Sequence, residues 1–119
     1  MASEFTLTPL PVRTTVATKQ PIQQSLEVAR FDLADALLYV AALEGTGGPT
    51  VTIRIITGMQ IDSEDGWVVA GTFAVVSTTN TSQKLRVDGL LKYIRWEVSG
   101  ITGTTPAVTF LINGMLRQN

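Results

Sequence analysis

The feature that most constrains the fold of this chain is the recurrence of short apolar segments between turn-forming residues. Residues 50–57 show the pattern clearly, because Val51, Ile53 and Ile55 alternate with polar residues. A period of two places alternate side chains on opposite faces of a strand, so this segment indicates a strand with one buried face. Turn signals about every 8–12 residues divide the chain into about seven or eight such strands, which favours an antiparallel sandwich or barrel over βαβ units.

The same alternation predicts a hydrophobic core. Residues 92–99 and 107–112 repeat the period of two, and residues 67–76 are apolar around Gly71, which indicates a bulge or a close neighbour. Residues 36–43 suit a helix by composition, but their short length and the Gly/Pro break behind them favour a buried strand. The predicted core consists of Val51, Ile53, Ile55, Ile94, Trp96, Val98, Val108, Phe110 and Ile112.

The N-terminal segment has a different composition. Pro9, Pro11 and Pro21 stand among Thr, Val and Gln, a mix that resists helix and cannot pair fully within a central strand. We therefore predict an all-β chain: an antiparallel, jelly-roll-like β-sandwich over residues 25–119, with an extended N-terminal arm over residues 1–24.

This arm has a functional and a plain interpretation. As a functional element it would lie on a neighbouring subunit, where its prolines lower the entropy lost on ordering. As a plain element it would be a disordered tail or an ordinary edge strand. The residues that would make the contact are the apolar ones along it, Phe5, Leu7, Leu10, Val12 and Val16.

Whole classes of chemistry are excluded by two missing residue types. The chain has no Cys and no His, which removes disulfides, the usual zinc sites and the Ser–His and Cys–His nucleophile pairs. We expect no enzyme activity, no catalytic residue, no cofactor and no metal. The acidic turn Asp62–Asp65 offers oxygen ligands for calcium, but its spacing does not fit an EF-hand loop, and a solvated hairpin turn explains the same residues.

Charge and hydropathy limit the partners. The formal net charge is −1 and the basic residues are scattered singly, so no stripe exists to neutralise a nucleic acid backbone. The longest mostly apolar stretch, residues 33–43, is far shorter than the ~18 residues that a membrane span needs, and the N-terminus does not resemble a signal peptide. Charged residues make up only 16% of the chain, which leaves few charges to keep copies apart and favours a homo-oligomer.

One strand face carries a second set of candidate contacts. Because Trp96 is in phase with the core, Tyr93, Arg95 and Glu97 project from the opposite face, and Arg54 joins them if the strands are neighbours. This set is either a cross-strand charge ladder on a solvated face or a protein contact patch, since Tyr and Arg are enriched at interfaces. The second interpretation makes Arg54, Tyr93 and Arg95 partner contacts.

A resemblance to a known family rests on the order of motifs from Val51 onward. The motifs are Ser63-Glu64-Asp65-Gly66-Trp67, Gly71-Thr72-Phe73, Gly89-Leu90, Tyr93-Ile94-Arg95-Trp96, Gly103-Thr104-Thr105-Pro106 and Val108-Thr109-Phe110. In this order they resemble small β-sandwich virion proteins of tailed bacteriophages, of the head decoration or auxiliary type. The motifs are turn and core residues over the C-terminal two-thirds of the chain, and the first 30 residues match nothing in that family.

The resemblance implies a structural role in a virion that is assembled in the host cytoplasm. The implied partners are the major capsid protein or other virion proteins, with the chain acting as a homo-oligomer, for example a trimer. An alternative is a carbohydrate- or receptor-binding sandwich of a phage tail, neck or fibre, whose ligand would lie on loops 45–49, 77–82 and 100–106. Those loops carry almost no aromatic residues for stacking on sugars.

Overall fold

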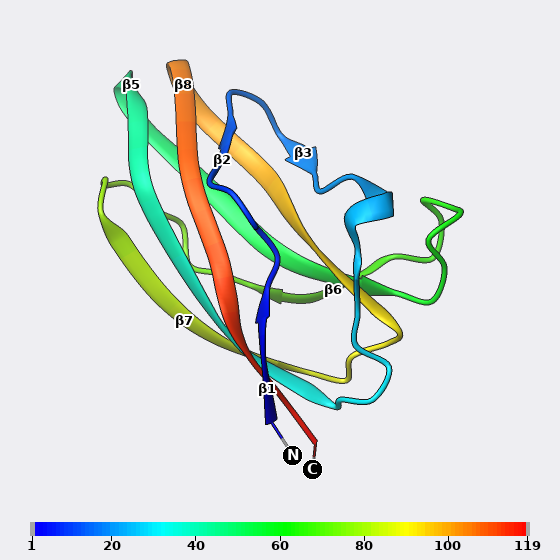
Figure 1. Cartoon of the computed structure of the whole chain (residues 1–119). Helices are drawn as coiled ribbons and strands as arrows, with labels where there is room; N and C mark the ends of the chain where they lie inside the picture. The colour runs from blue at the N-terminus through cyan, green and yellow to red at the C-terminus, as the bar shows by residue number, and fades with distance from the viewer. Residues whose placement is uncertain (1, 119) are drawn as a thin grey trace.

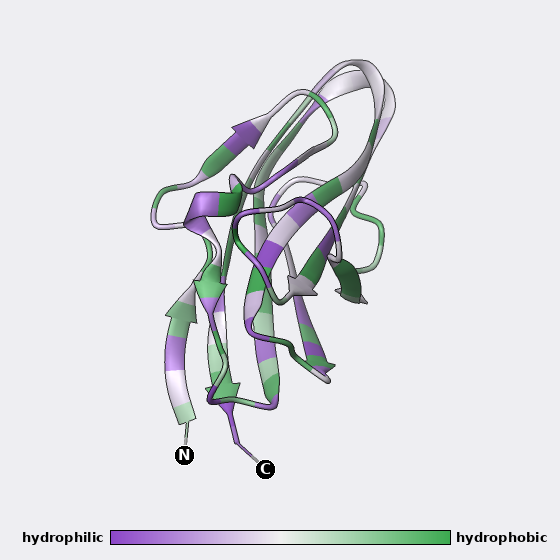
Figure 2. Cartoon of the chain, turned by 90° about the vertical axis from the view of Figure 1, so that its right-hand side faces the viewer, coloured by the Kyte–Doolittle hydropathy of each residue, from purple (hydrophilic) through white to green (hydrophobic). Residues whose placement is uncertain are grey.

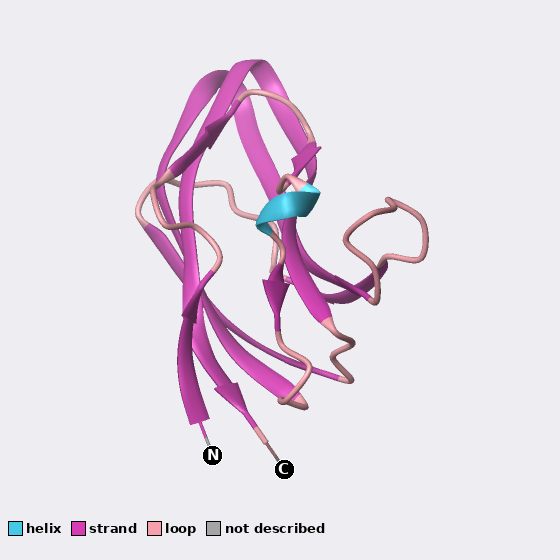
Figure 3. Ribbon diagram, turned by 45° about the vertical axis from the view of Figure 1, so that its right-hand side comes forward, coloured by secondary structure: helices cyan, strands magenta, loops and turns pink. Residues whose placement is uncertain are grey.

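The computed structural model describes residues 2–118. This part of the chain is all-β: one curled antiparallel sheet of eight strands, with a single short 3₁₀-helix and no α-helix (Figures 1 and 3). No helix within it is long and apolar enough to cross a membrane. The elements are β1 (Ala2–Thr6), β2 (Val12–Thr14), β3 (Thr18–Lys19), η1 (Ile22–Gln24), β4 (Leu26–Glu27), β5 (Leu33–Gly58), β6 (Val68–Thr72), β7 (Thr81–Asp88) and β8 (Tyr93–Arg117).

Two long strands form the centre of the sheet. β5 has 26 residues and β8 has 25, and they pair antiparallel from Leu33 opposite Arg117 to Gly58 opposite Tyr93. We call this pair the central ribbon. β5 pairs on its other edge with β7 along its first half and with β6 along its second half. β8 pairs on its other edge with the four N-terminal strands.

The central ribbon folds over near its middle, and this corrects the expected count of short strands. The Gly-rich segments 45–49 and 100–106 were expected to be loops, but they continue β5 and β8 and pair with each other, as Thr46 does with Thr104. Three register shifts between Val40 and Thr50 bend the two strands together. Figure 1 shows both strands turning over at the top of the view.

This fold-over brings the two halves of the central ribbon face to face around one core. Trp96 from one half meets Phe110 from the other edge-on, with ring centroids 5.2 Å apart. All nine core residues expected from the alternation are buried, with exposed fractions of at most 5%, so that prediction is confirmed. Hydrophobic and hydrophilic residues alternate along the strands in Figure 2.

The structure shows the N-terminal segment against its own sheet and not as a separate extended arm. β1 pairs with β8 over residues 113–117, and β2, β3 and β4 continue along the same edge. Phe5 and Leu7 enter the core, and their burial favours docking on this chain. The prolines fall between the strands, where they interrupt the pairing without preventing it.

Gly71 in β6 shows both of the features expected of it. The β5–β6 register passes from Ile55 opposite Gly71 to Ile56 opposite Val69, so Ala70 is an extra residue in a β-bulge. A Cβ at Gly71 would overlap the side chain of Val87 in β7. The missing side chain therefore lets β6 and β7 approach each other where the sheet curls.

Candidate interaction site

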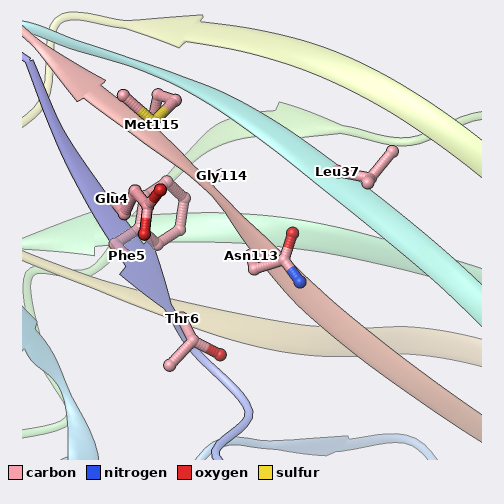
Figure 4. Close-up of a pocket in the computed structure, with 7 residues that line it drawn as sticks. All are labelled: Glu4, Phe5, Thr6, Leu37, Asn113, Gly114 and Met115. Atoms are coloured by element: carbon pink, nitrogen blue, oxygen red, sulfur yellow. The ribbon is translucent and has the colours of Figure 1, made fainter.

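A groove crosses the outer face of the sheet where β1, β8 and β5 lie side by side (Figure 4). Its volume is about 690 Å³. We call it the outer groove. Its lining consists of Glu4, Phe5, Thr6, Leu37, Asn113, Gly114 and Met115.

The strand register explains why the surface is hollow here. Phe5 lies opposite Gly114, and the Phe5 side chain belongs to the buried core, so it does not fill the outer face. Gly114 is in phase with the buried Ile112 and Leu116, and without a Cβ it lets the β8 backbone approach the β5 backbone at Asp35. The walls come from neighbours that are out of phase with the core, including Leu37, which is 43% exposed, and Met115.

The lining of the outer groove can make both apolar contacts and hydrogen bonds with a bound partner. Leu37 and Met115 offer apolar contact, and Thr6 and Asn113 offer hydroxyl and amide hydrogen-bonding groups. Glu4 is the one ionisable side chain in the lining.

An exposed ion-pair cluster lies beside the groove, since Asp35 is opposite Met115 in the register. Arg86 donates from Nε to Asp35 Oδ1 at 2.7 Å and from Nη2 to Oδ2 at 3.0 Å, and Arg117 Nε donates to Oδ2 at 2.8 Å. These hydrogen bonds, that of Arg86 first, hold the pKa of Asp35 well below its usual range, and Asp35 in turn raises the pKa of Arg86. We call these three residues the Asp35 cluster. Two cations against one carboxylate leave a positive charge there.

A second cluster lies on the outer face of the other half of the central ribbon, where Arg95 is 1% exposed. Its Nε and Nη2 donate to the carbonyl oxygen of Gln20 at 2.9 and 2.6 Å. Its Nη1 donates to Glu64 Oε1 at 2.9 Å, and the guanidinium carbon lies 4.8 Å from the ring centroid of Trp67. The hydrogen bond from Arg95 lowers the pKa of Glu64. We call these four residues the Arg95 cluster.

The Arg95 cluster holds the β5–β6 loop, which projects from the body of the sheet in Figures 1 and 3. Trp67 Nε1 donates to the carbonyl oxygen of Ser63 at 3.0 Å, which closes the loop on itself. A Cβ at Gly58 would lie 2.7 Å from Trp67 Cδ2, so the indole rests directly on the strand backbone. The loop is therefore anchored to the sheet.

This geometry corrects the expected solvated ladder. Arg54 does pair with Glu97 across the strands, from Nε to Oε1 at 2.5 Å, as one interpretation predicted. Arg95 and Glu97 are nevertheless buried, because the residue 20 segment and the β5–β6 loop cover their side of the sheet. The pattern of residues 93–97 gave the direction of the side chains, but it carried no information on what covers them.

The predicted contact residues fall into three groups by exposure. Phe5, Leu7 and Arg95 are buried within this chain. Val12, Arg54 and Tyr93 are half-buried, and Val12 packs against the core. Leu10 and Val16 are 77% and 61% exposed, between β1 and β3. The outer groove was not predicted; the signal for it in the sequence was Leu37, an apolar residue out of phase with Ala36 and Leu38.

The acidic turn forms no cluster of metal ligands. Glu64 bonds to Arg95, while Asp62 and Asp65 are exposed. Across residues 2–118, no group of three His, Cys, Asp or Glu side chains is placed to hold a metal ion. The proposed sugar-binding loops 45–49 and 100–106 belong to paired strands of the central ribbon, so they do not form free ligand loops.

Comparisons with known proteins give no relative. No protein family model, no curated protein and no solved structure matches the chain.

Proposed function

We propose that this chain is a non-enzymatic structural protein that binds another protein through the outer groove. Following the sequence resemblance, the proposed role is that of a head decoration or auxiliary protein in the virion of a tailed bacteriophage. It would be assembled in the host cytoplasm, and it would bind and stabilise the major capsid lattice as an oligomer. The observation that carries the proposal is the outer groove, an exposed apolar hollow with one ionisable side chain in its lining.

The finer description of the fold belongs to the same proposal. We take the folded-over central ribbon as a jelly-roll-like β-sandwich, supported by the single core between its two halves. Of the proposed arm, the parts that remain available to a neighbour are the exposed side chains of Leu10 and Val16, which lie on either side of β2. Exposed apolar side chains of this kind gain free energy when a partner covers them.

On a repeating capsid lattice, weak individual contacts are sufficient for stable binding of an oligomer. Two modules that are linked bind with an affinity above that of either one, because the second contact is intramolecular. An oligomer on a repeating capsid surface has this advantage, so each outer groove needs only a modest affinity.

The experiment adds the purified chain to expanded capsids of the phage that encodes it and measures co-sedimentation. Leu37→Lys places a charge in the outer groove, and Leu91→Lys is the matched control at another exposed leucine, 37% exposed and outside the groove lining. We expect the Leu37 variant to lose binding and the Leu91 variant to retain it.

Two outcomes would reject the proposal. If the unaltered chain does not sediment with capsids, the decoration role is wrong. If both variants bind like the unaltered chain, the outer groove is not the contact surface. Sedimentation with host polysaccharide in place of capsids would support the carbohydrate- or receptor-binding alternative.

A further inference from the structure

The charged residues around the outer groove are separated across the sheet. Glu4 and Leu37 lie on opposite sides of β8, as Figure 4 shows, with Glu4 in the edge strand β1. On the side of Leu37 the next strand is β7, which carries Lys84 opposite Leu37 and Arg86 opposite Asp35. The groove therefore has a carboxylate at one end and cations beyond the other end.

The β7 side of the groove has a net positive charge. Where β5, β7 and β8 pair over residues 33–40, 81–88 and 110–117, their cations are Lys84, Arg86 and Arg117, and their carboxylates are Asp35 and Asp88. Asp35 is shared by Arg86 and Arg117. Lys84 is exposed and makes no ion pair within residues 2–118, so it is the cation that can pair with a partner.

The distance across the groove matches the repeat of an extended peptide. β1, β8, β5 and β7 are neighbours in this order, and neighbouring strands lie about 4.8 Å apart, so β1 and β7 are about 14 Å apart. In an extended peptide every second side chain points to the same face and each residue rises about 3.3 Å, so residues i and i+4 are about 13 Å apart. Side chains at i and i+4 can therefore reach Glu4 and Lys84, while the side chain at i+2 lies over the apolar residues between them.

We propose that the outer groove binds an extended segment of another protein that crosses the strands and carries a basic, an apolar and an acidic side chain at every second position. The basic side chain pairs with Glu4 and the acidic one with Lys84, and the apolar one contacts Leu37 and Met115. The segment can run in either chain direction, because the charges fix only the order of its side chains across the groove. The inference rests on the proposed function and names the chemistry of the partner at the same groove.

The sequence of this chain argues against a second copy as the source of the segment. Residues 88–92 are its only five-residue stretch with an acidic and a basic end around a central apolar residue. Leu90 at the centre packs against the core, and Gly89 has a φ of 64°, so the stretch is neither extended nor available to a groove. The partner is therefore a different protein.

The experiment selects binders of the unaltered full chain from a displayed library of short random peptides, without capsids. We expect the selected peptides to carry a basic, an apolar and an acidic residue at i, i+2 and i+4, in either direction. Lys84→Glu should replace the acidic residue of the pattern by a basic one, since it reverses the charge at that end of the groove. Lys92→Glu is the matched control at another exposed lysine, outside the groove lining, and should select the original pattern.

The affinity of one selected peptide, measured by fluorescence anisotropy, gives a second readout. Lys84→Glu should weaken binding and Lys92→Glu should leave it unchanged, and added salt should weaken binding to the unaltered chain. No binders, binders without this charge pattern or an unchanged pattern for Lys84→Glu would overturn the inference. Capsid binding without the peptide pattern would reject this inference alone, whereas the pattern without capsid binding would reject the decoration role alone.

Discussion

The Arg95 cluster and the Asp35 cluster place the same kind of ion pair on opposite halves of one ribbon, in different surroundings. The side chain of Arg95 is 2% exposed, whereas those of Arg86 and Arg117 are 63% and 45% exposed. Exposed arginine–carboxylate pairs contribute little to stability, with a median of about 0–1 kcal/mol. A buried arginine has lost its hydration, so each of its donors needs a partner.

The two halves of the central ribbon differ in whether their outer face is covered. On the Arg95 side the sheet is covered, and the cluster fixes the chain that covers it. On the Asp35 side the sheet is open, and the cluster lies beside the outer groove. Changes at the two clusters should therefore differ in their effect on the free energy of unfolding.

The largest effect is expected for Arg95→Ala. The change leaves a cavity beneath Trp67 and removes both donors to the carbonyl oxygen of Gln20, so the free energy of unfolding should fall by about 3 kcal/mol. Urea unfolding measures the loss. Arg86→Ala is the comparison at the exposed cluster and should cost much less, because water screens an exposed ion pair. Equal losses would contradict the distinction between the two clusters.

Gly58→Ala should cost about 2 kcal/mol. The added methyl would lie 2.7 Å from Trp67 Cδ2 and push the indole off the strand, which is an overpacking penalty. Thermal unfolding followed by tryptophan fluorescence gives the stability, and the same measurement in a Trp96→Phe background isolates the signal of Trp67. Gly100→Ala is the control, because a Cβ there meets nothing within 4 Å. Similar behaviour of the two variants would show that Trp67 is not held against the backbone.

Glu64→Gln should cost about 1 kcal/mol. The change leaves the charge of Arg95 without its carboxylate, but the Glu64 side chain is 58% exposed, so water screens most of the penalty of a fully buried pair. Denaturant unfolding at neutral pH measures it, with Asp65→Asn as the control in the same loop. A loss as large as that of Arg95→Ala would mean that the ion pair, and not packing, dominates the Arg95 cluster.

The smallest effect is expected for Asp35→Asn, and it should be present at neutral pH and disappear in strong acid. The pKa of Asp35 is lower in the folded chain than in the unfolded chain, so the unfolded state binds more protons in acid. The stabilisation is present above the unfolded pKa of about 3.9 and is lost as the pH falls toward the folded value. Stability measured between neutral pH and strong acid should therefore fall less steeply in the variant. An unchanged slope would mean that the two arginines do not hold the carboxylate in solution.

The sequence was informative wherever a side chain's environment follows from its own strand. The alternation of Ile94, Trp96 and Val98 predicted their burial, because a period of two fixes the face. It could not predict the burial of Arg95, since residues 20 and 64 cover that face from distant parts of the chain. The glycines at 45–48 indicate turns, yet two such segments that pair with each other bend a ribbon without ending it. The outer groove depends on Phe5 meeting Gly114, a register that local patterns do not contain.

The end-to-end pairing of β5 with β8 has a consequence for how the chain is made. β5 can pair with β6 and β7 soon after they are made, but its partner for Leu33 on the other edge is Arg117, so the central ribbon cannot close at this end until residue 117 has been synthesised. Chains whose contacts join distant residues fold slowly, in milliseconds to seconds. During that time the apolar faces of β5 are unprotected, which makes a newly made chain a substrate for chaperones and a hazard for aggregation.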